Sequence, residues 1–152
     1  MSAGGRDTTL GDDDQRPERS DRWHRGWEQL TRLNGTTDPK VVRRIEELSP
    51  DLARMIVEFG YGEAYADRPM DVLDEQQRQL VTIGALAAMG GCDDQLAVHA
   101  RVAINAGLAP AQVIEAILHA LPYIGFPRTI NALEAVRRVL ERGRDRPGTA
   151  PT

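Results

Sequence analysis

The chain has 152 residues, of which 41% are hydrophobic and 28% charged, a size and balance typical of one soluble globular domain. A formal net charge of −4 argues against a dedicated nucleic-acid-binding protein, and a single cysteine excludes an intrachain disulfide. With only three histidines beside that cysteine, we expect no metal site. The apolar runs are too short to cross a membrane, and the polar first residues predict no secretory signal, so we expect a cytoplasmic protein.

The polar composition of both ends predicts disordered tails over residues 1–20 and 143–152, which leaves a folded domain over 21–142. Apolar residues within this domain recur at spacings of three and four, and no stretch alternates with the period of two that a strand requires. The predicted class is therefore all-α, a single-domain bundle of five to seven helices.

Helix-capping signals divide the first part of the domain. Ser20 or Asp21 can cap a first helix, which the Asn34-Gly35 pair ends. Apolar residues over 41–48 predict a short second helix.

A third helix is predicted over residues 51–59, because Ser49-Pro50 supplies an N-cap followed by proline at the first helical position. Gly60 and Gly62 are expected to break this helix. Residues 61–69 are then expected to form a loop or irregular turn.

The next helix is the most apolar of the chain. Asp74 and Gln77, three residues apart, form a capping-box pattern at its start. Apolar residues cover it on nearly all sides over 80–89, which predicts burial all round, and Gly90-Gly91 ends it.

Three helices complete the predicted bundle. Asp93 or Asp94 is expected to cap a helix that ends at Gly107. Pro110 starts another, which Pro122 and the Gly125-Phe126-Pro127 stretch interrupt before a last helix begins.

The strongest candidates for catalytic residues are His99 and its neighbours in the sequence. On its predicted helix, His99 shares a face with Leu96 and Ala103 at spacings of three and four. Burial there would lower the pKa of the imidazole and keep it neutral near pH 7, which suits general acid–base work. The alternative is a core histidine that its neighbours satisfy. Cys92, just before this helix, is expected to be a small packing residue.

Other candidates lie elsewhere in the sequence. His119 and Tyr123 form an i, i+4 pair before the predicted break, and the alternative is that both tips lie at the surface. Arg128 follows the break, where a guanidinium and free backbone N–H groups could together hold a carboxylate. Glu63 is the best-placed carboxylate outside a predicted helix, and Arg78 is the one charge beside the apolar run. Either could instead be a solvated surface charge.

Three segments, residues 50–71, 77–91 and 96–133, closely resemble the carboxymuconolactone decarboxylase family. The resemblance extends from about Trp23 to Leu140. Its most specific part runs from His99 to the Tyr123-x-Gly125-Phe126-Pro127 motif. It implies a small all-α protein of the alkylhydroperoxidase D-like fold that assembles as a homo-oligomer, a trimer or hexamer, with active sites at or near subunit contacts.

The family has two main chemical branches. One contains 4-carboxymuconolactone decarboxylase. The other, the alkylhydroperoxidase D type, uses a CxxC pair followed four residues later by histidine. Cys92 and His99 match the first cysteine and the histidine of that motif, but Gln95 replaces the second cysteine. Because a dithiol relay needs a resolving thiol, the decarboxylase branch is favoured.

Membership of the decarboxylase branch implies a small carboxylate or lactone substrate that loses carbon dioxide through a dienolate, a reaction that requires no cofactor. His99 is then expected to donate the proton, Tyr123 or His119 to hydrogen-bond the developing oxyanion, and Glu63 to orient His99. Further residues are expected to contact the substrate: Arg78 and Arg128 through its carboxylates, with Tyr61, Cys92 and Phe126.

Two positions depart from the family pattern. His119 stands where members often carry glutamine, and Arg128 where decarboxylases often carry a small residue. Three alternatives therefore stay open beside the lyase. They are a biosynthetic decarboxylase, isomerase or cyclase on a larger substrate, a peroxidase that uses an external thiol, and a non-catalytic binding protein.

Overall fold

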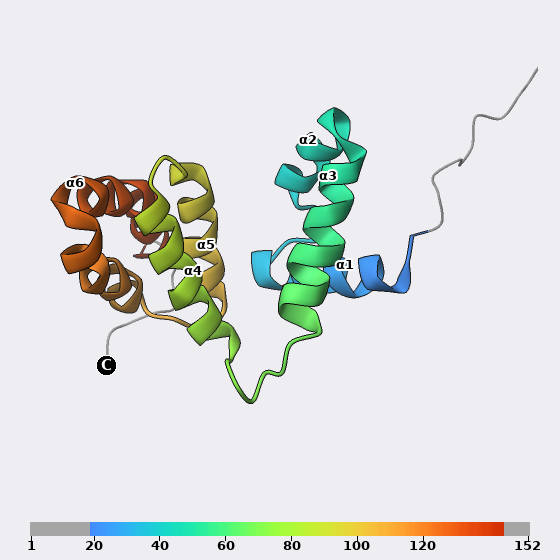
Figure 1. The fold of residues 1–152 in the computed structure, drawn as a ribbon, viewed down its shortest axis with the longest axis horizontal. Helices are drawn as coiled ribbons and strands as arrows, with labels where there is room; N and C mark the ends of the chain where they lie inside the picture. The colour runs from blue at the N-terminus through green and yellow to red at the C-terminus, as the bar shows by residue number, and fades with distance from the viewer. Residues whose placement is uncertain (1–18, 145–152) are drawn as a thin grey trace, which may run out of the picture.

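Seven helical segments make up residues 19–144, the part of the chain that the computed structural model describes (Figure 1). They are α1 (Asp21–Asn34), α2 (Lys40–Leu48), α3 (Pro50–Met55), the π-helix η1 (Ile56–Ala66), α4 (Glu75–Met89), α5 (Asp93–Asn105) and α6 (Pro110–Arg144). The predicted all-α class is confirmed. The predicted tails, 1–20 and 143–152, lie almost entirely outside the described residues.

The helices form two groups, each with its own apolar cluster (Figure 1). Helices α4, α5 and α6 bury Ile83, Leu96 and Ile117 between them, while α1, α2, α3 and η1 enclose a smaller cluster. Polar contacts join the two groups, since the Asn105 side-chain amide of α5 donates to the Leu33 carbonyl of α1 at 3.1 Å.

Most of the predicted helix boundaries are confirmed. The side chains of Ser20 and Ser49 accept hydrogen bonds from backbone N–H groups at the starts of α1 and α3, and Asp74 and Gln77 form a complete capping box on α4. The cap predicted for α5 is wrong. Cys92 occupies that position without a side-chain hydrogen bond, and the two aspartates lie in the first turn. Their charge still favours the helix, because that end of the macrodipole is positive.

The loop predicted over residues 61–69 is wrong for most of its length, because η1 continues α3 through both glycines to Ala66. Gly62 and Gly26 of α1 allow a close helix crossing, whereas a Cβ at Gly60 would meet nothing within 4 Å. A Cβ added to Gly62 would lie 3.2 Å from the Arg22 carbonyl oxygen of α1, and one added to Gly26 would lie 2.0 Å from the Val57 carbonyl oxygen of η1. Side chains at either position would push the two backbones apart.

The prediction that α4 is buried on all sides is wrong for the single chain. Ile83 and Ala87 are buried, but Val81 is 64% exposed and Met89 69% exposed. The buried residues of α4, Gln79, Ile83 and Ala87, recur every four positions, so the single chain buries one face of this helix.

Helix α6 is interrupted where the sequence predicts it, at Gly125, whose φ of 78° is not helical. Pro122 stays within the helix before this kink. Within residues 19–144, no helix combines the length and apolar character that crossing a membrane requires.

Candidate active site

His99 lines a cavity of about 550 Å³ between α2, η1 and α5. The buried face of α5, with Leu96, Ala100 and Ala103, fixes the orientation of the helix, and His99 lies half-buried beside that face. The cavity is lined by Val41, Arg44, Ile45 and Leu48 of α2, by Ile56 and Tyr61 of η1, and by Asp94, Gln95, Val98 and His99 of α5. The imidazole therefore has both a fixed position and access to a small molecule.

A hydrogen bond to Gln79 of α4 holds the imidazole. His99 Nδ1 lies 3.1 Å from Gln79 Oε1, and Gln79 is fully buried. The other end of the same amide donates from Nε2 to the Tyr65 hydroxyl at 3.2 Å. Because a carbonyl oxygen only accepts, Nδ1 must be the protonated nitrogen of His99. The second ring nitrogen, Nε2, is then free for chemistry.

Burial lowers the pKa of His99 below its ordinary value. Burial disfavours the charged imidazolium, so the ring is neutral at neutral pH. An anionic group that bound beside the ring would oppose this effect and favour protonation.

Tyr61 provides a neutral hydroxyl in the same cavity. Burial raises the pKa of Tyr61, with a smaller opposing effect from a hydrogen bond to Asn34. Its ring stacks on that of Tyr65 with centroids 5.8 Å apart, which fixes the phenol in place. A phenol kept neutral in this way can donate a hydrogen bond to a developing oxyanion.

Arg44 is the cation of this cavity. It makes no ion pair with another described residue, whereas neighbouring Arg43 pairs with Asp38. Asp94 is the one carboxylate among the lining residues. A guanidinium without a partner is suited to hold a carboxylate.

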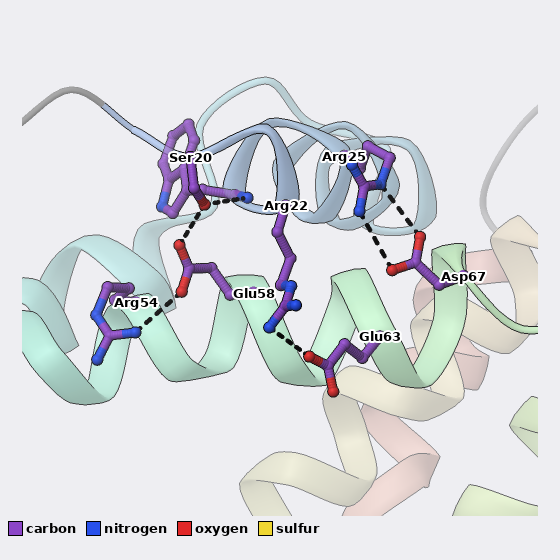
Figure 2. A network of polar contacts seen from close by, with 8 residues as sticks. Ser20, Arg22, Arg25, Arg54, Glu58, Glu63 and Asp67 are labelled. Carbon is purple, nitrogen blue, oxygen red and sulfur yellow. Dashed lines mark hydrogen bonds and ion pairs between the residues drawn. The ribbon is translucent and has the colours of Figure 1, made fainter.

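Glu63 and Arg78 contact other parts of the protein. Glu63 Oε1 lies 2.5 Å from Arg22 Nη1, in the set of polar contacts that ties α1 to η1 (Figure 2). The guanidinium of Arg78 donates to the carbonyl oxygens of Leu73 and Pro69 at 2.8 and 2.9 Å. Neither side chain lines the His99 cavity.

The candidates on α6 lie at a different surface. His119 and Tyr123 line an apolar groove of about 690 Å³ between α4 and α6. Phe126 is 70% exposed, and the side chain of Arg128 lies against Gly90 at the end of α4. The structure therefore does not bring these four residues together with His99 in one chain.

Cys92 is half-buried, and its thiol donates to the Leu86 carbonyl oxygen at 3.3 Å. Gln95, which stands where the peroxidase motif has its second cysteine, lines the His99 cavity. Among residues 19–144, no group of three or more histidine, cysteine or carboxylate side chains is placed to hold a metal ion.

Sequence reasoning missed Gln79 and Arg44. A signal for Gln79 exists, because it is a polar residue spaced four and eight residues before Ile83 and Ala87, the buried positions of α4. Arg44 had no such signal. Its position beside His99 depends on how α2 and α5 lie across the cavity.

Comparison with known proteins shows which family this sequence resembles. The sequence profile of the carboxymuconolactone decarboxylase family matches residues 50–138. The chain is 32% identical over 123 residues to a 4-carboxymuconolactone decarboxylase from Acinetobacter baylyi, which covers 79% of this chain and 87% of that protein. It is 34% identical over 86 residues to the nitrosuccinic acid decarboxylase npaB of Metarhizium robertsii, over 57% of each chain.

The family match includes the helices that carry His99, Gln79 and Tyr61, and the Acinetobacter relative aligns over most of both chains. The resemblance found in the sequence is thereby confirmed. The chain belongs to the carboxymuconolactone decarboxylase family.

Proposed function

We propose that the protein is a carboxy-lyase that acts on a carboxylated lactone or a similar enolisable carboxylate. The observation that carries this proposal is the His99 cavity, which combines an oriented imidazole, a neutral phenol and an arginine without an ion pair. Both relatives named above are decarboxylases, which supports the same class of reaction.

The proposed reaction breaks the bond between the substrate carbon and its carboxylate. The electron pair moves through the conjugated double bond into the ring carbonyl, which gives a dienolate and carbon dioxide. His99 then transfers a proton from Nε2 to the substrate carbon, and solvent returns one proton to His99. In sum, the carboxylate and one proton become a C–H bond and carbon dioxide.

Charge explains how His99 acquires the proton to be transferred. Burial favours the neutral ring, but a bound carboxylate beside Nε2 favours the imidazolium. Substrate binding therefore charges the acid at the moment when it is needed.

The other cavity residues take two roles in this proposal. The Tyr61 hydroxyl donates a hydrogen bond to the carbonyl oxygen on which negative charge develops, a role that the sequence suggested for Tyr123 or His119. Arg44 orients a substrate carboxylate, the role suggested for Arg78 and Arg128. The roles suggested for those four residues, and for Glu63, stay predictions.

We also propose that the protein is a homo-oligomer in which the groove between α4 and α6 contacts another copy. Val81 and Tyr123 are exposed and line this groove, and most of its other lining side chains are apolar. Such a surface is unfavourable in water, and contact with a second copy would bury it.

The experiment that tests the reaction is carbon dioxide release from 4-carboxymuconolactone and from nitrosuccinate, the substrates named by the two relatives. We expect turnover of at least one by the wild type and its loss in His99→Gln. The exposed His24→Gln serves as the matched control and should keep the wild-type rate. Folded wild-type protein that releases carbon dioxide from neither compound would contradict the proposal for both substrates.

A further inference from the structure

We propose that Gln79 is a positioning residue, which holds His99 in the tautomer that carries its proton on Nδ1. The inference deepens the proposed function and rests on it for the consequence in catalysis. The geometry that carries it is a chain of four hydrogen bonds running from His99 through α4 and η1 to a backbone carbonyl.

The backbone carbonyl at the far end of this hydrogen-bond chain determines which group donates in every bond. The Thr82 hydroxyl lies 2.9 Å from the Arg78 carbonyl oxygen, which can only accept, so Thr82 donates its one hydrogen there. The Tyr65 hydroxyl lies 3.3 Å from Thr82 Oγ1 and must therefore be the donor in that contact. Tyr65 can then only accept from Gln79.

The acceptor role of Tyr65 fixes the orientation of the Gln79 amide, and the amide in turn fixes the donor on His99. Gln79 Nε2 donates to Tyr65, which leaves Oε1, the acceptor, facing His99 Nδ1. With the amide turned over, Gln79 would need a hydrogen from Tyr65, and the contact between Tyr65 and Thr82 would have no donor. The turned amide would therefore lose the part-buried hydrogen bond between Tyr65 and Thr82, which the observed orientation keeps.

The arrangement suits a ring that gains and loses a proton. Both the neutral Nδ1–H form and the imidazolium donate to Gln79 Oε1, so the contact is kept in both charge states. The ring need not turn over between proton uptake and proton transfer, and Nε2 is the nitrogen that exchanges the proton in each cycle. An amide also cannot relay protons as a carboxylate can, so the proton must return to His99 through the cavity.

The first test measures the tautomer directly and needs no activity. The wild type contains three histidines, and His24→Gln and His119→Gln identify the His99 signals in a long-range ¹H–¹⁵N NMR spectrum. We expect a protonated Nδ1 and an unprotonated Nε2 in the neutral ring of His99. A protonated Nε2 in the wild type would overturn the inference, whether or not any substrate is turned over.

Two substitutions probe this chain of hydrogen bonds. Gln79→Met removes the acceptor, and Tyr65→Phe removes the group that orients the amide while leaving Gln79 in place. In both we expect the Nδ1–H form to lose its dominance, and kcat to fall about 10- to 100-fold with little change in KM, by analogy with the loss of partners that orient metal-bound histidines. Gln76→Met is the matched control on α4, because Gln76 donates to the Ala106 carbonyl and does not contact His99.

Gln79→Glu separates orientation from a merely structural role. It keeps an oxygen acceptor at the same place, so the Nδ1–H form should persist, but its buried charge should raise the pKa of His99 and move the pH profile of kcat upward. The charged or titratable groups that share the cavity with His99, namely Arg44, Tyr61 and Asp94, are unchanged in this variant. An unchanged tautomer in both Gln79→Met and Tyr65→Phe would overturn the proposal. If Gln79→Met does not fold, the tautomer of His99 in Tyr65→Phe alone decides whether the proposal holds.

Discussion

Gly26 of α1 lies directly against the carbonyl oxygen of Val57 in η1, so close that a Cβ at position 26 would stand 2.0 Å from that oxygen. The two helices cross here with their backbones in contact. This crossing holds η1, and with it Tyr61 and Tyr65, in place beside α4 and α5.

Gly26→Ala should therefore destabilise the protein by about 3 kcal/mol, the upper part of the range for overpacked buried sites. The obstacle is backbone on both sides, which cannot move aside as a flexible side chain can. Chemical denaturation of the purified variant measures the loss. Gly60→Ala is the matched control, since a Cβ there meets nothing within 4 Å. It should be neutral or stabilise by about 0.5–1 kcal/mol, because alanine favours a helix over glycine. Equal losses in both variants would contradict a specific contact at Gly26.

The lowered pKa of His99 predicts how stability depends on pH. The unfolded chain holds an ordinary histidine with a pKa of about 6.5, while burial lowers the pKa of His99 in the folded state. Between these two values the unfolded state binds more protons, so the free energy of unfolding falls as the pH drops through this window and the loss levels off below the folded pKa.

His99→Gln should remove this part of the pH dependence. Denaturation curves at pH 7 and pH 5 should show a smaller difference for the variant than for the wild type, with His24→Gln as the exposed control. A difference in His99→Gln as large as that of the wild type would mean that His99 titrates alike in both states.

Arg44 predicts an effect on substrate binding. Arg44→Gln should raise KM for a carboxylate substrate about tenfold, the loss of one charge-assisted hydrogen bond, with a smaller effect on kcat. Arg43→Gln is the matched control one residue away on α2, because Arg43 pairs with Asp38 and does not line the His99 cavity. An effect equal in the two variants would assign the change to α2 as a whole and remove Arg44 from the site.

The exposed side of α4 predicts an oligomer interface. Val81→Glu places a charge in the groove between α4 and α6 and should shift the protein toward smaller species in size-exclusion chromatography with light scattering. Val72→Glu is the control, because Val72 is comparably exposed at 69% but lies outside that groove. A wild type that is monomeric, or a Val81→Glu variant of unchanged mass, would contradict this interface.

The sequence by itself determined the features that depend on neighbours along the chain. Hydrogen bonds from Ser20, Ser49 and the Asp74–Gln77 pair form within one turn, so their spacing was enough to predict where helices begin. The break at Gly125 has the same local origin. His99 was placed correctly beside a buried face because the faces of a helix follow from its period.

Tertiary structure decided what depends on residues far apart in sequence. Gly60 and Gly62 are typical of a helix end, but both lie within a continuous helix, where the close passage of α1 makes glycine a packing requirement at position 62. Glu63, the best-placed carboxylate in the sequence, lies against Arg22 on the surface. Gln79 and Arg44 reach the site from α4 and α2, and their positions relative to His99 depend on how these helices cross, which no local pattern records.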